Sequence, residues 1–220
     1  ARYSAAVEKP SYTYATGSSA VSLTVSFSLD MSTMPKSPFT DVVAGSWYFD
    51  AALYASSHNL MLGTSPTEFS PNITMTRGML VTVLYRMNGS PSVSGKTPFT
   101  DVRTDEWYSA AVLWAYQNGI VTGMSDTTFD PINNVTREQM ATILFRYTKT
   151  AAPDKAKASA DLSGFADAGS VNDWAVDAMR WAVGQKLIAG ITLEQSVYLQ
   201  PRGNATRAQA ATVLTRYYAQ

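Results

Sequence analysis

Apolar residues recur every three or four positions in two kinds of segment, and each kind occurs three times along the chain. The first kind starts near a tryptophan, and its apolar positions in the second copy are Trp107, Ala111, Trp114 and Ala115. This spacing predicts an amphipathic helix whose apolar face packs into a core. Ser46 and Asp173 just precede the tryptophan in two copies, and we expect them to cap this helix.

The second kind of segment opens with Thr-Arg, as in "TREQMATILFRY" from Thr136 to Tyr147. A threonine in this place is a typical N-cap, so Thr76, Thr136 and Thr206 are predicted to begin helices. Three residues later a glutamine completes a capping box in two copies, whereas Met79 cannot return the hydrogen bond. A proline in "FSPN", "FDPI" or "LQPR" ends any helix before it. Each copy is therefore predicted to be a helix–turn–helix pair with a buried seam.

Strict alternation of apolar and small polar residues occurs in "VSLTVSFSL" (21–29), which is typical of a strand. "SYTYAT" (11–16) could pair with it through a turn at 17–19. A lone two-stranded hairpin is only marginally stable in water. We therefore expect residues 1–37 to be the last strands of an upstream domain, or strands that pair with a second molecule and so mediate self-association.

Four residue types recur in register, which shows that the chain contains three copies of one unit. The columns are Asp41, Asp101 and Asp167; Trp47, Trp107 and Trp174; Gly63, Gly123 and Gly190; and Arg77, Arg137 and Arg207. The interval from aspartate to arginine is 36 residues in the first two copies and 40 in the third. Linkers rich in Gly, Pro, Ser, Ala and Lys separate the copies, which we place at 38–92, 93–152 and 160–220.

A pair of short helices cannot bury both of its sides, but three pairs can do so by packing about a shared axis. We therefore predict a mainly α-helical fold, a pseudo-threefold bundle with grooves between neighbouring copies. Of the 220 residues 45% are hydrophobic, which is enough for a sizeable core. Trp114 and Trp181, on the apolar helix face, are predicted to belong to that core.

Charge and residue usage exclude several classes of function. Seventeen basic side chains balance seventeen acidic ones, which argues against nucleic acid or an anionic membrane as the partner. No apolar run approaches the roughly 20 residues of a membrane span, so no membrane insertion is expected, and the lack of cysteine excludes disulfides. The chain opens at Ala1 without a signal peptide, so we expect an excised or processed piece of a longer protein.

Catalytic chemistry has few candidate residues. His58 is the only histidine, and no cluster has the spacing of metal ligands. A glycosidase needs two carboxylates that flank the scissile bond, and Asp101 with the non-repeated Glu138 is a pair that nothing else supports. We therefore expect no enzymatic activity, no metal and no cofactor.

The arginine column poses a physical question, because each arginine stands in the first position of a predicted helix. The helix N-terminus carries partial positive charge, and a cation there costs about 0.3–1 kcal/mol. One explanation is anion binding, since unpaired N–H groups and a planar guanidinium together favour a carboxylate. The other explanation is a structural ion pair between the arginine and an aspartate of the same or a neighbouring copy.

The three copies resemble S-layer homology repeats, with "FTD" followed by Trp-Tyr, a Gly before a small polar turn, "F-x-P" and a "TR" helix start. The resemblance covers residues 38–220. It implies a bacterial surface protein held non-covalently to the cell wall, with a pseudo-trimeric fold and ligand in the inter-repeat grooves. The implied receptor is an anionic secondary cell-wall polysaccharide whose hexosamine carries pyruvate ketals. The resemblance further implies that the arginine, aspartate, tryptophan and glycine columns bind this ligand.

Each of these columns also has a structural explanation. The aspartates could accept sugar hydroxyls or orient the arginine, or they could cap the turn ahead of the first helix. The tryptophans could stack on a sugar or lie in the core, and the glycines could supply a turn conformation. For the whole chain, the alternative to glycan binding is a protein–protein assembly scaffold whose grooves hold a peptide or a neighbouring protomer.

The sequence departs from the family pattern at several positions. The common "T-R-A-E" motif ends in glutamate, where this chain has Met79, Gln139 and Gln209. In the third copy Leu199 replaces the phenylalanine of "F-x-P", and four extra residues fall in the same region. We therefore expect the groove of the third copy to be the weakest, and Arg207 to contribute less to binding than the other two arginines.

Overall fold

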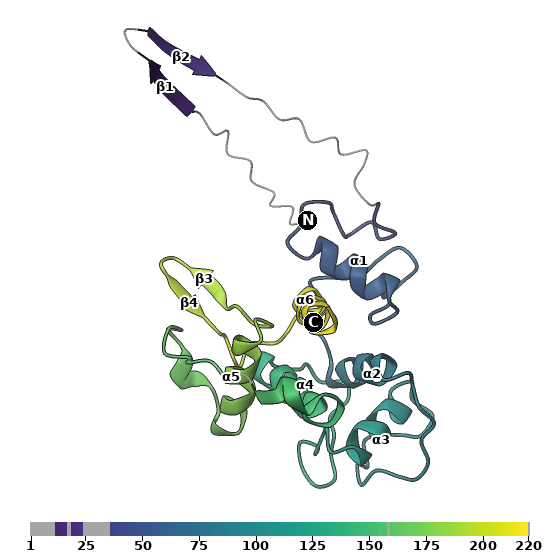
Figure 1. Ribbon diagram of the computed structural model, residues 1–220. Coiled ribbons are helices and arrows are strands. Elements are labelled where there is room, and N and C mark those ends of the chain that lie inside the picture. The colour runs from purple at the N-terminus through teal and green to yellow at the C-terminus, as the bar shows by residue number, and fades with distance from the viewer. Residues whose placement is uncertain (1–11, 17–18, 24–35, 158, 220) are drawn as a thin grey trace.

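The computed structural model describes residues 12–16, 19–23, 36–157 and 159–219, which form a mainly α-helical protein (Figure 1). The first two repeats contain the helices α1 (Phe49–Ser57), α2 (Arg77–Met87), α3 (Ser109–Gln117) and α4 (Arg137–Ala151). The third repeat contains α5 (Val176–Gly184) and α6 (Arg207–Tyr218). The predicted mainly α-helical class is confirmed, and each column arginine is the first residue of its helix.

Shorter elements complete the third repeat and the linker before it. They are the 3₁₀ turns η2 (Pro153–Lys157), η3 (Ala168–Ser170) and η4 (Asp173–Ala175) and the strands β3 (Ile191–Leu193) and β4 (Ser196–Tyr198). The two strands pair antiparallel, with Ile191 opposite Tyr198. The additional residues of the third repeat thus build a small hairpin where the first repeat has a single bridge between Ser65 and Glu68.

The first helix of each repeat begins later than the sequence predicts. In α1 the N-cap residue is Tyr48, which makes no side-chain capping bond. The N–H of Phe49 donates instead to the main-chain carbonyl of Ser46 at 2.9 Å. The predicted side-chain caps Ser46 and Asp173 are therefore wrong, because main-chain carbonyls of the preceding turn already accept these N–H groups, and Asp173 itself opens η4.

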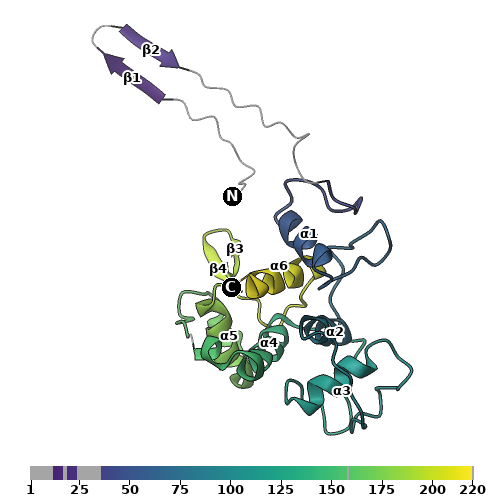
Figure 2. The same ribbon diagram turned by 45° about the vertical axis from the view of Figure 1, so that its right-hand side comes forward.

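Each outer helix packs against the central helix of the preceding repeat. The contacts pair α3 with α2, α5 with α4, and α1 with α6. Figures 1 and 2 show α2, α4 and α6 in the middle of the molecule, with α1, α3 and α5 around them. The seam that we predicted inside each copy therefore lies between copies. The contact of α1 with α6 joins the first repeat to the last.

A closed cycle of main-chain hydrogen bonds links the three repeats ahead of their central helices. The N–H of Met75 donates to Ala205 at 2.8 Å, that of Ala205 to Val135 at 2.9 Å, and that of Val135 to Met75 at 2.9 Å. All three residues have no exposed surface. Each repeat therefore donates one bond to a neighbour and accepts one from the other, and the cycle includes all three.

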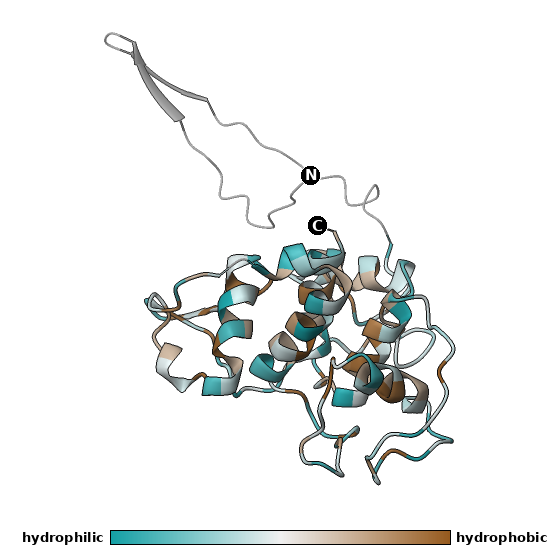
Figure 3. Cartoon of the chain, turned by 60° about the horizontal axis from the view of Figure 1, so that its bottom comes forward, coloured by the Kyte–Doolittle hydropathy of each residue, from teal (hydrophilic) through white to brown (hydrophobic). Residues whose placement is uncertain are grey.

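The hydrophobic core is continuous through the three repeats. It includes Phe69, Phe129 and Leu199, the corresponding residues of the three "F-x-P" turns. Trp114 and Trp181 are also buried, as predicted. Figure 3 shows hydrophobic residues where the helices pack together and hydrophilic residues on the outer turns. None of the described helices combines the length and the apolar character needed to cross a membrane.

The N-terminal segment forms a hairpin of β1 (Tyr12–Thr16) and β2 (Ser19–Leu23) that lies apart from the helices in Figures 1 and 2. The strands pair antiparallel, with Thr16 opposite Ser19. The first strand agrees with the prediction, whereas the second begins two residues earlier than predicted, and residues 24–29 lie outside the described residues. The proposed upstream domain and the pairing with a second molecule stay predictions.

The seam between α1 and α6 allows a test of the packing. Ala55 is completely buried on α1, whereas Ser57 on the same helix is exposed. Leucine at a packed position forces its neighbours apart, so Ala55→Leu should lower the free energy of unfolding by about 1–3 kcal/mol. Ser57→Leu should change it by less than about 0.5 kcal/mol. Urea denaturation measures both, and equal effects of the two substitutions would contradict a packed α1–α6 seam.

Candidate functional site

The three column arginines are buried, and each reaches into another repeat. Arg77, Arg137 and Arg207 have only 5, 6 and 6% of their surface exposed. Their Nε atoms donate to the carbonyls of Phe129 at 2.9 Å, Leu199 at 2.7 Å and Phe69 at 2.9 Å, respectively. These carbonyls belong to the "F-x-P" turns. Each guanidinium therefore links the start of one central helix to the turn of the next repeat in the cycle.

Burial of the guanidinium groups lowers the pKa of all three arginines, and carboxylates of the adjoining repeat oppose this shift. The carboxylates are Asp130 and Asp101 for Arg77, Asp167 for Arg137, and Asp41 for Arg207. Arginine is the most basic of the side chains, so these groups are taken to stay charged at neutral pH. In the described part of the chain, ion pairs within 4 Å involve Arg103 with Asp105 and Lys157 with Asp154. The structural ion pair considered for the column arginines is therefore wrong.

The aspartate column holds the same turns from the other side. Both carboxylate oxygens of Asp41 accept main-chain bonds, from the N–H of Phe69 at 2.8 Å and of Ser70 at 2.7 Å. Asp101 and Asp167 accept the corresponding pairs in their repeats. The predicted cap of the turn ahead of the first helix is therefore wrong. The peptide group between residues 69 and 70 donates to Asp41 and accepts from Arg207, so the aspartate orients the arginine through this peptide.

The N–H groups at the starts of the central helices all have protein partners. In α2 the Oγ1 of Thr76 accepts from the N–H of Met79 at 3.2 Å. The N–H of Arg77 donates to Asn133 at 3.0 Å, and that of Gly78 to Pro131 at 2.8 Å. The first-turn N–H groups of α4 and α6 have corresponding partners, and the threonine caps and both capping boxes are as predicted. Anion binding by unpaired helix N–H groups is therefore wrong, and anion binding by the guanidinium groups stays a prediction.

Two clefts open beside these arginines, and each takes residues from all three repeats. The Arg77 cleft, about 310 Å³, is lined by Arg77 of the first repeat, Gly123 and α4 of the second, and Trp174 of the third. The Arg137 cleft, about 480 Å³, is lined by Arg137 of the second repeat, Gly190 and α6 of the third, and Trp47 of the first. Both volumes lie in the range of about 300–1,000 Å³ typical of ligand pockets.

The outer nitrogens of Arg77 and Arg137 face these clefts. An arginine has five N–H donors, and the described side-chain hydrogen bonds of these two residues use only Nε. No side-chain nitrogen or oxygen in the described ranges is both buried and without a partner. The Nη groups therefore reach solvent, and the clefts that these side chains line provide that access.

Arg207 differs from the other two arginines. Its Nη2 donates to the carbonyl of Leu62 at 2.6 Å, in addition to the bond made by Nε. The reason we gave for its weaker role is wrong, because Leu199 and the inserted residues of the third repeat adjoin Arg137. Since leucine has no ring, Arg137 also lacks the contact of Arg77 and Arg207, whose guanidinium carbons lie 4.8 Å from the ring centroids of their phenylalanine partners.

The tryptophan column lies at the surface. Trp47, Trp107 and Trp174 are 65, 58 and 54% exposed, so a place in the buried core is wrong for all three. Large exposed aromatic side chains are typical of binding surfaces. Trp47 and Trp174 contribute to the two clefts, and their contact with a sugar stays a prediction.

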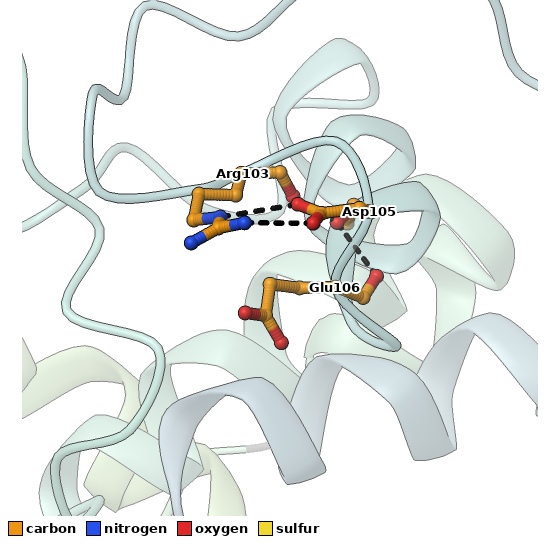
Figure 4. A network of polar contacts seen from close by, with 4 residues as sticks. Arg103, Asp105 and Glu106 are labelled. Carbon is orange, nitrogen blue, oxygen red and sulfur yellow. Dashed lines mark hydrogen bonds and ion pairs between the residues drawn. The ribbon is translucent and has the colours of Figure 1, made fainter.

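The loop before Trp107 carries a local polar network (Figure 4). Arg103 donates to both oxygens of Asp105, at 3.1 and 2.8 Å. The hydroxyl of Ser109 donates to the main-chain carbonyls of Arg103 and Glu106. The ion pair is well exposed, so water and salt screen it and it adds little to stability. The bonds of Ser109 connect the first residue of α3 to the main chain of this loop.

The glycine column is required by the turns. Gly123 and Gly190 have φ of +81° and +79°, a region that side chains disfavour. A Cβ atom at Gly63 would lie 2.5 Å from the carbonyl oxygen of Ser65. The predicted turn role is confirmed. Gly123 and Gly190 also line the clefts. A Cβ atom there would lie 2.5 Å from the ring of Phe99 or 2.6 Å from the side chain of Val197, so the glycines are needed for the close packing of the turns.

Sequence reasoning missed a second arginine column and the role of the glutamines. Arg146 and Gln139 line the Arg77 cleft, and Arg216 and Gln209 line the Arg137 cleft. The signal was present in the three Thr-Arg segments, because an arginine recurs nine residues after the first in each of them. Glutamine was interpreted only as a capping residue, although the same side chain can also face a cleft.

The two carboxylates considered for a hydrolase both have structural partners. Asp101 accepts the N–H groups of Phe129 and Asp130. Glu138 is 2% exposed and accepts the main-chain N–H and the side-chain amide of Asn172. Neither carboxylate belongs to the lining of the two arginine clefts. They are therefore not placed to flank a glycosidic bond there.

Known proteins share the repeat. The family model of the S-layer homology domain matches residues 38–78, 98–141 and 164–211. An endoglucanase of Bacillus sp. (strain KSM-635) is 33% identical over 81% of this chain, which corresponds to 18% of that enzyme. The surface-layer 125 kDa protein of Lysinibacillus sphaericus is 31% identical over 70% of this chain and 12% of its own length. The chain thus spans less than a fifth of these relatives, so the endoglucanase match carries no catalytic activity to it.

The aspartate column can be tested through stability. Asp101→Ala removes the acceptor of two main-chain N–H groups, which should lower the free energy of unfolding by about 2–4 kcal/mol. For a chain of this size the melting temperature should fall on the order of 10 °C. Asp126→Ala, at an exposed position near the same turn, is the control and should shift it by no more than a degree or two. Similar melting temperatures for the two variants would show that Asp101 does not hold the turn.

Proposed function

Because the chain belongs to the S-layer homology family, we propose that it anchors its protein to the bacterial cell wall by binding an anionic wall polysaccharide in the Arg77 and Arg137 clefts. The module is not catalytic, and its place is the cell surface, as for the surface-layer relatives. The observation that carries the proposal is the pair of buried arginines whose Nη groups open into clefts beside exposed tryptophans.

The chemistry of the clefts favours a carboxylate on a sugar. A guanidinium presents two parallel N–H groups, which match the two oxygens of a carboxylate. Nε is already bonded to the protein, so the two Nη groups are the edge that is left for the ligand. The exposed tryptophan at each cleft offers a flat apolar surface for a sugar ring. A pyruvate ketal places one carboxylate on a sugar ring and therefore satisfies both requirements.

Sedimentation with purified wall fragments tests this function. The protein should sediment with intact fragments and stay in solution with fragments from which the secondary polysaccharide has been removed chemically. A third preparation, from which only the ketal pyruvate has been released by mild acid, should also fail to retain it. Equal sedimentation with all three preparations would contradict glycan anchoring and would favour a protein partner in the wall fraction.

The arginine edge can be tested with a variant that has a matched control. Arg77→Lys removes one bond to a buried carbonyl and Arg207→Lys removes two, so the second should destabilise the fold at least as much as the first. Arg77→Lys also removes the Nη groups of Arg77, which have no described protein partner and belong to a side chain that lines the Arg77 cleft. Calorimetric titration with a pyruvylated wall oligosaccharide should therefore show the loss of one class of site for Arg77→Lys and wild-type binding for Arg207→Lys. Equal losses would contradict the distinction between the clefts.

The tryptophans provide a test that does not depend on stability. Trp47→Ala and Trp174→Ala change exposed side chains, so the melting temperature should stay within a few degrees of the wild type. The double variant should bind the oligosaccharide about tenfold more weakly, because stacking at each cleft is lost. Trp107→Ala is the control, since its side chain lines neither cleft. An unchanged affinity of the double variant would exclude stacking on these residues.

A further inference from the structure

We propose that the Arg77 and Arg137 clefts each bind two anionic groups of one glycan segment, so that the ligand carries a second negative charge within one sugar of the ketal carboxylate. This inference rests on the proposed function and concerns the class of glycan that the clefts select.

The first observation is that each cleft has two arginines from different helices. The Arg77 cleft also contains Arg146 of α4, and the Arg137 cleft also contains Arg216 of α6. The two arginines of one central helix are nine residues apart, which is two and a half helical turns. They therefore project from opposite sides of that helix and serve different clefts. Each cleft receives the first arginine of one helix and the second arginine of another.

The second observation is that no residue lining either cleft is acidic. The glutamines of the capping boxes are neutral, and their Oε1 atoms already accept the N–H of the capping threonine at 3.1 Å. The amide nitrogen of Gln139 makes a long contact of 3.9 Å with the sulfur of Met124, which lines the same cleft, so this amide group lies at the cleft wall. Two cations and a neutral glutamine thus line each cleft with no carboxylate among them. The charge of Arg146 also contributes to the lowered pKa of Arg77, after the larger effect of burial.

The second arginines retain donors for a ligand. Arg146 donates from Nη1 to the hydroxyl of Thr122 at 3.3 Å, and Arg216 donates from Nη1 to the carbonyl of Leu187 at 3.0 Å. Each of these bonds uses one of the five N–H groups of the side chain. Arg146 is half-buried and Arg216 is exposed, so both reach the solvent side of the cleft. The buried arginine is suited to the ketal carboxylate, and the outer arginine to a charge on the adjoining sugar.

Two like charges in a partly enclosed cleft repel each other. Asp101 and Asp130 beside Arg77, and Asp167 beside Arg137, already offset part of this charge, but none of them lines a cleft. A dianionic ligand places a second negative charge beside the outer arginine and makes a second charge-assisted hydrogen bond. The second anion is an oxyanion in either case, a uronate carboxylate or a phosphate ester. Both fit the donors that are present, and the two sources are separated by experiment.

Calorimetric titration of the full chain with four synthetic probes tests the inference. The first probe is a disaccharide with a pyruvate ketal on its hexosamine and a neutral second sugar. The second carries a uronic acid in place of the neutral sugar, the third carries a phosphate there, and the fourth lacks every anionic group. At moderate salt, at least one dianionic probe should bind about tenfold more tightly than the monoanionic probe. The dianionic probe with the higher affinity shows whether the second charge is a uronate or a phosphate.

Arg146→Gln combined with Arg216→Gln should reduce this advantage to less than about twofold and leave the affinity for the monoanionic probe within about threefold. Arg86→Gln, the corresponding exposed arginine of α2, lines neither cleft and should behave as the wild type. Equal wild-type affinity for monoanionic and dianionic probes would overturn the inference and leave the proposed function intact. A double variant that binds monoanionic and dianionic probes more weakly by the same factor would also overturn the inference and leave the proposed function intact. If the four probes bind equally or not at all, the proposed function itself fails.

Discussion

The fold depends on main-chain hydrogen bonds that no repeat can make by itself. Met75, Val135 and Ala205 bind one another in a closed cycle, and the first N–H groups of α2, α4 and α6 donate to loops of a neighbouring repeat. A buried N–H group without a partner costs about 1–3 kcal/mol. A single repeat would expose or leave unpaired several such groups together with an apolar helix face. The repeats are therefore units of sequence, whereas the unit of folding contains all three.

The same constraint explains the arginine at each helix start. A cation there costs about 0.3–1 kcal/mol against the helix dipole, whereas a hydrogen bond from a charged group to a buried carbonyl contributes about 1.5–3 kcal/mol. The Nε of each arginine makes such a bond to another repeat. Lysine has a single ammonium group and cannot bond to the protein with one edge while it offers a second, planar edge to a ligand. The guanidinium thus serves the assembly of the fold and the proposed recognition at once.

Most local interactions were predictable from the sequence, with the side-chain caps Ser46 and Asp173 as exceptions, whereas interaction partners distant in sequence were not. The threonine caps, the turn glycines and the helical class follow from interactions within a few residues, and all were predicted. Asp41 was assigned to the wrong turn because its partners at Phe69 and Ser70 are far away in sequence. We predicted the helix–helix seam inside one copy, but it lies between copies. Because the three copies have the same apolar helix faces, the sequence does not show whether such a face packs against its own copy or a neighbouring one. Trp107 and Trp114 were predicted on the same apolar face of one helix, and the tertiary packing exposes the first and buries the second.

The features of each cleft come from all three repeats, and this changes how departures from the family pattern are interpreted. Leu199 lies in the third repeat but removes a ring from beside Arg137 of the second. Met79 lies in the first repeat, at the position of the glutamines that line the Arg77 and Arg137 clefts. It therefore belongs with Arg207, which also binds the carbonyl of Leu62 in the first repeat. Counting intact motifs within each repeat would rank the third repeat as the weakest. Counting the arginine, glutamine, glycine and tryptophan that line a cleft instead gives complete sets for the Arg77 and Arg137 clefts, and sets Arg207 and Met79 apart from them.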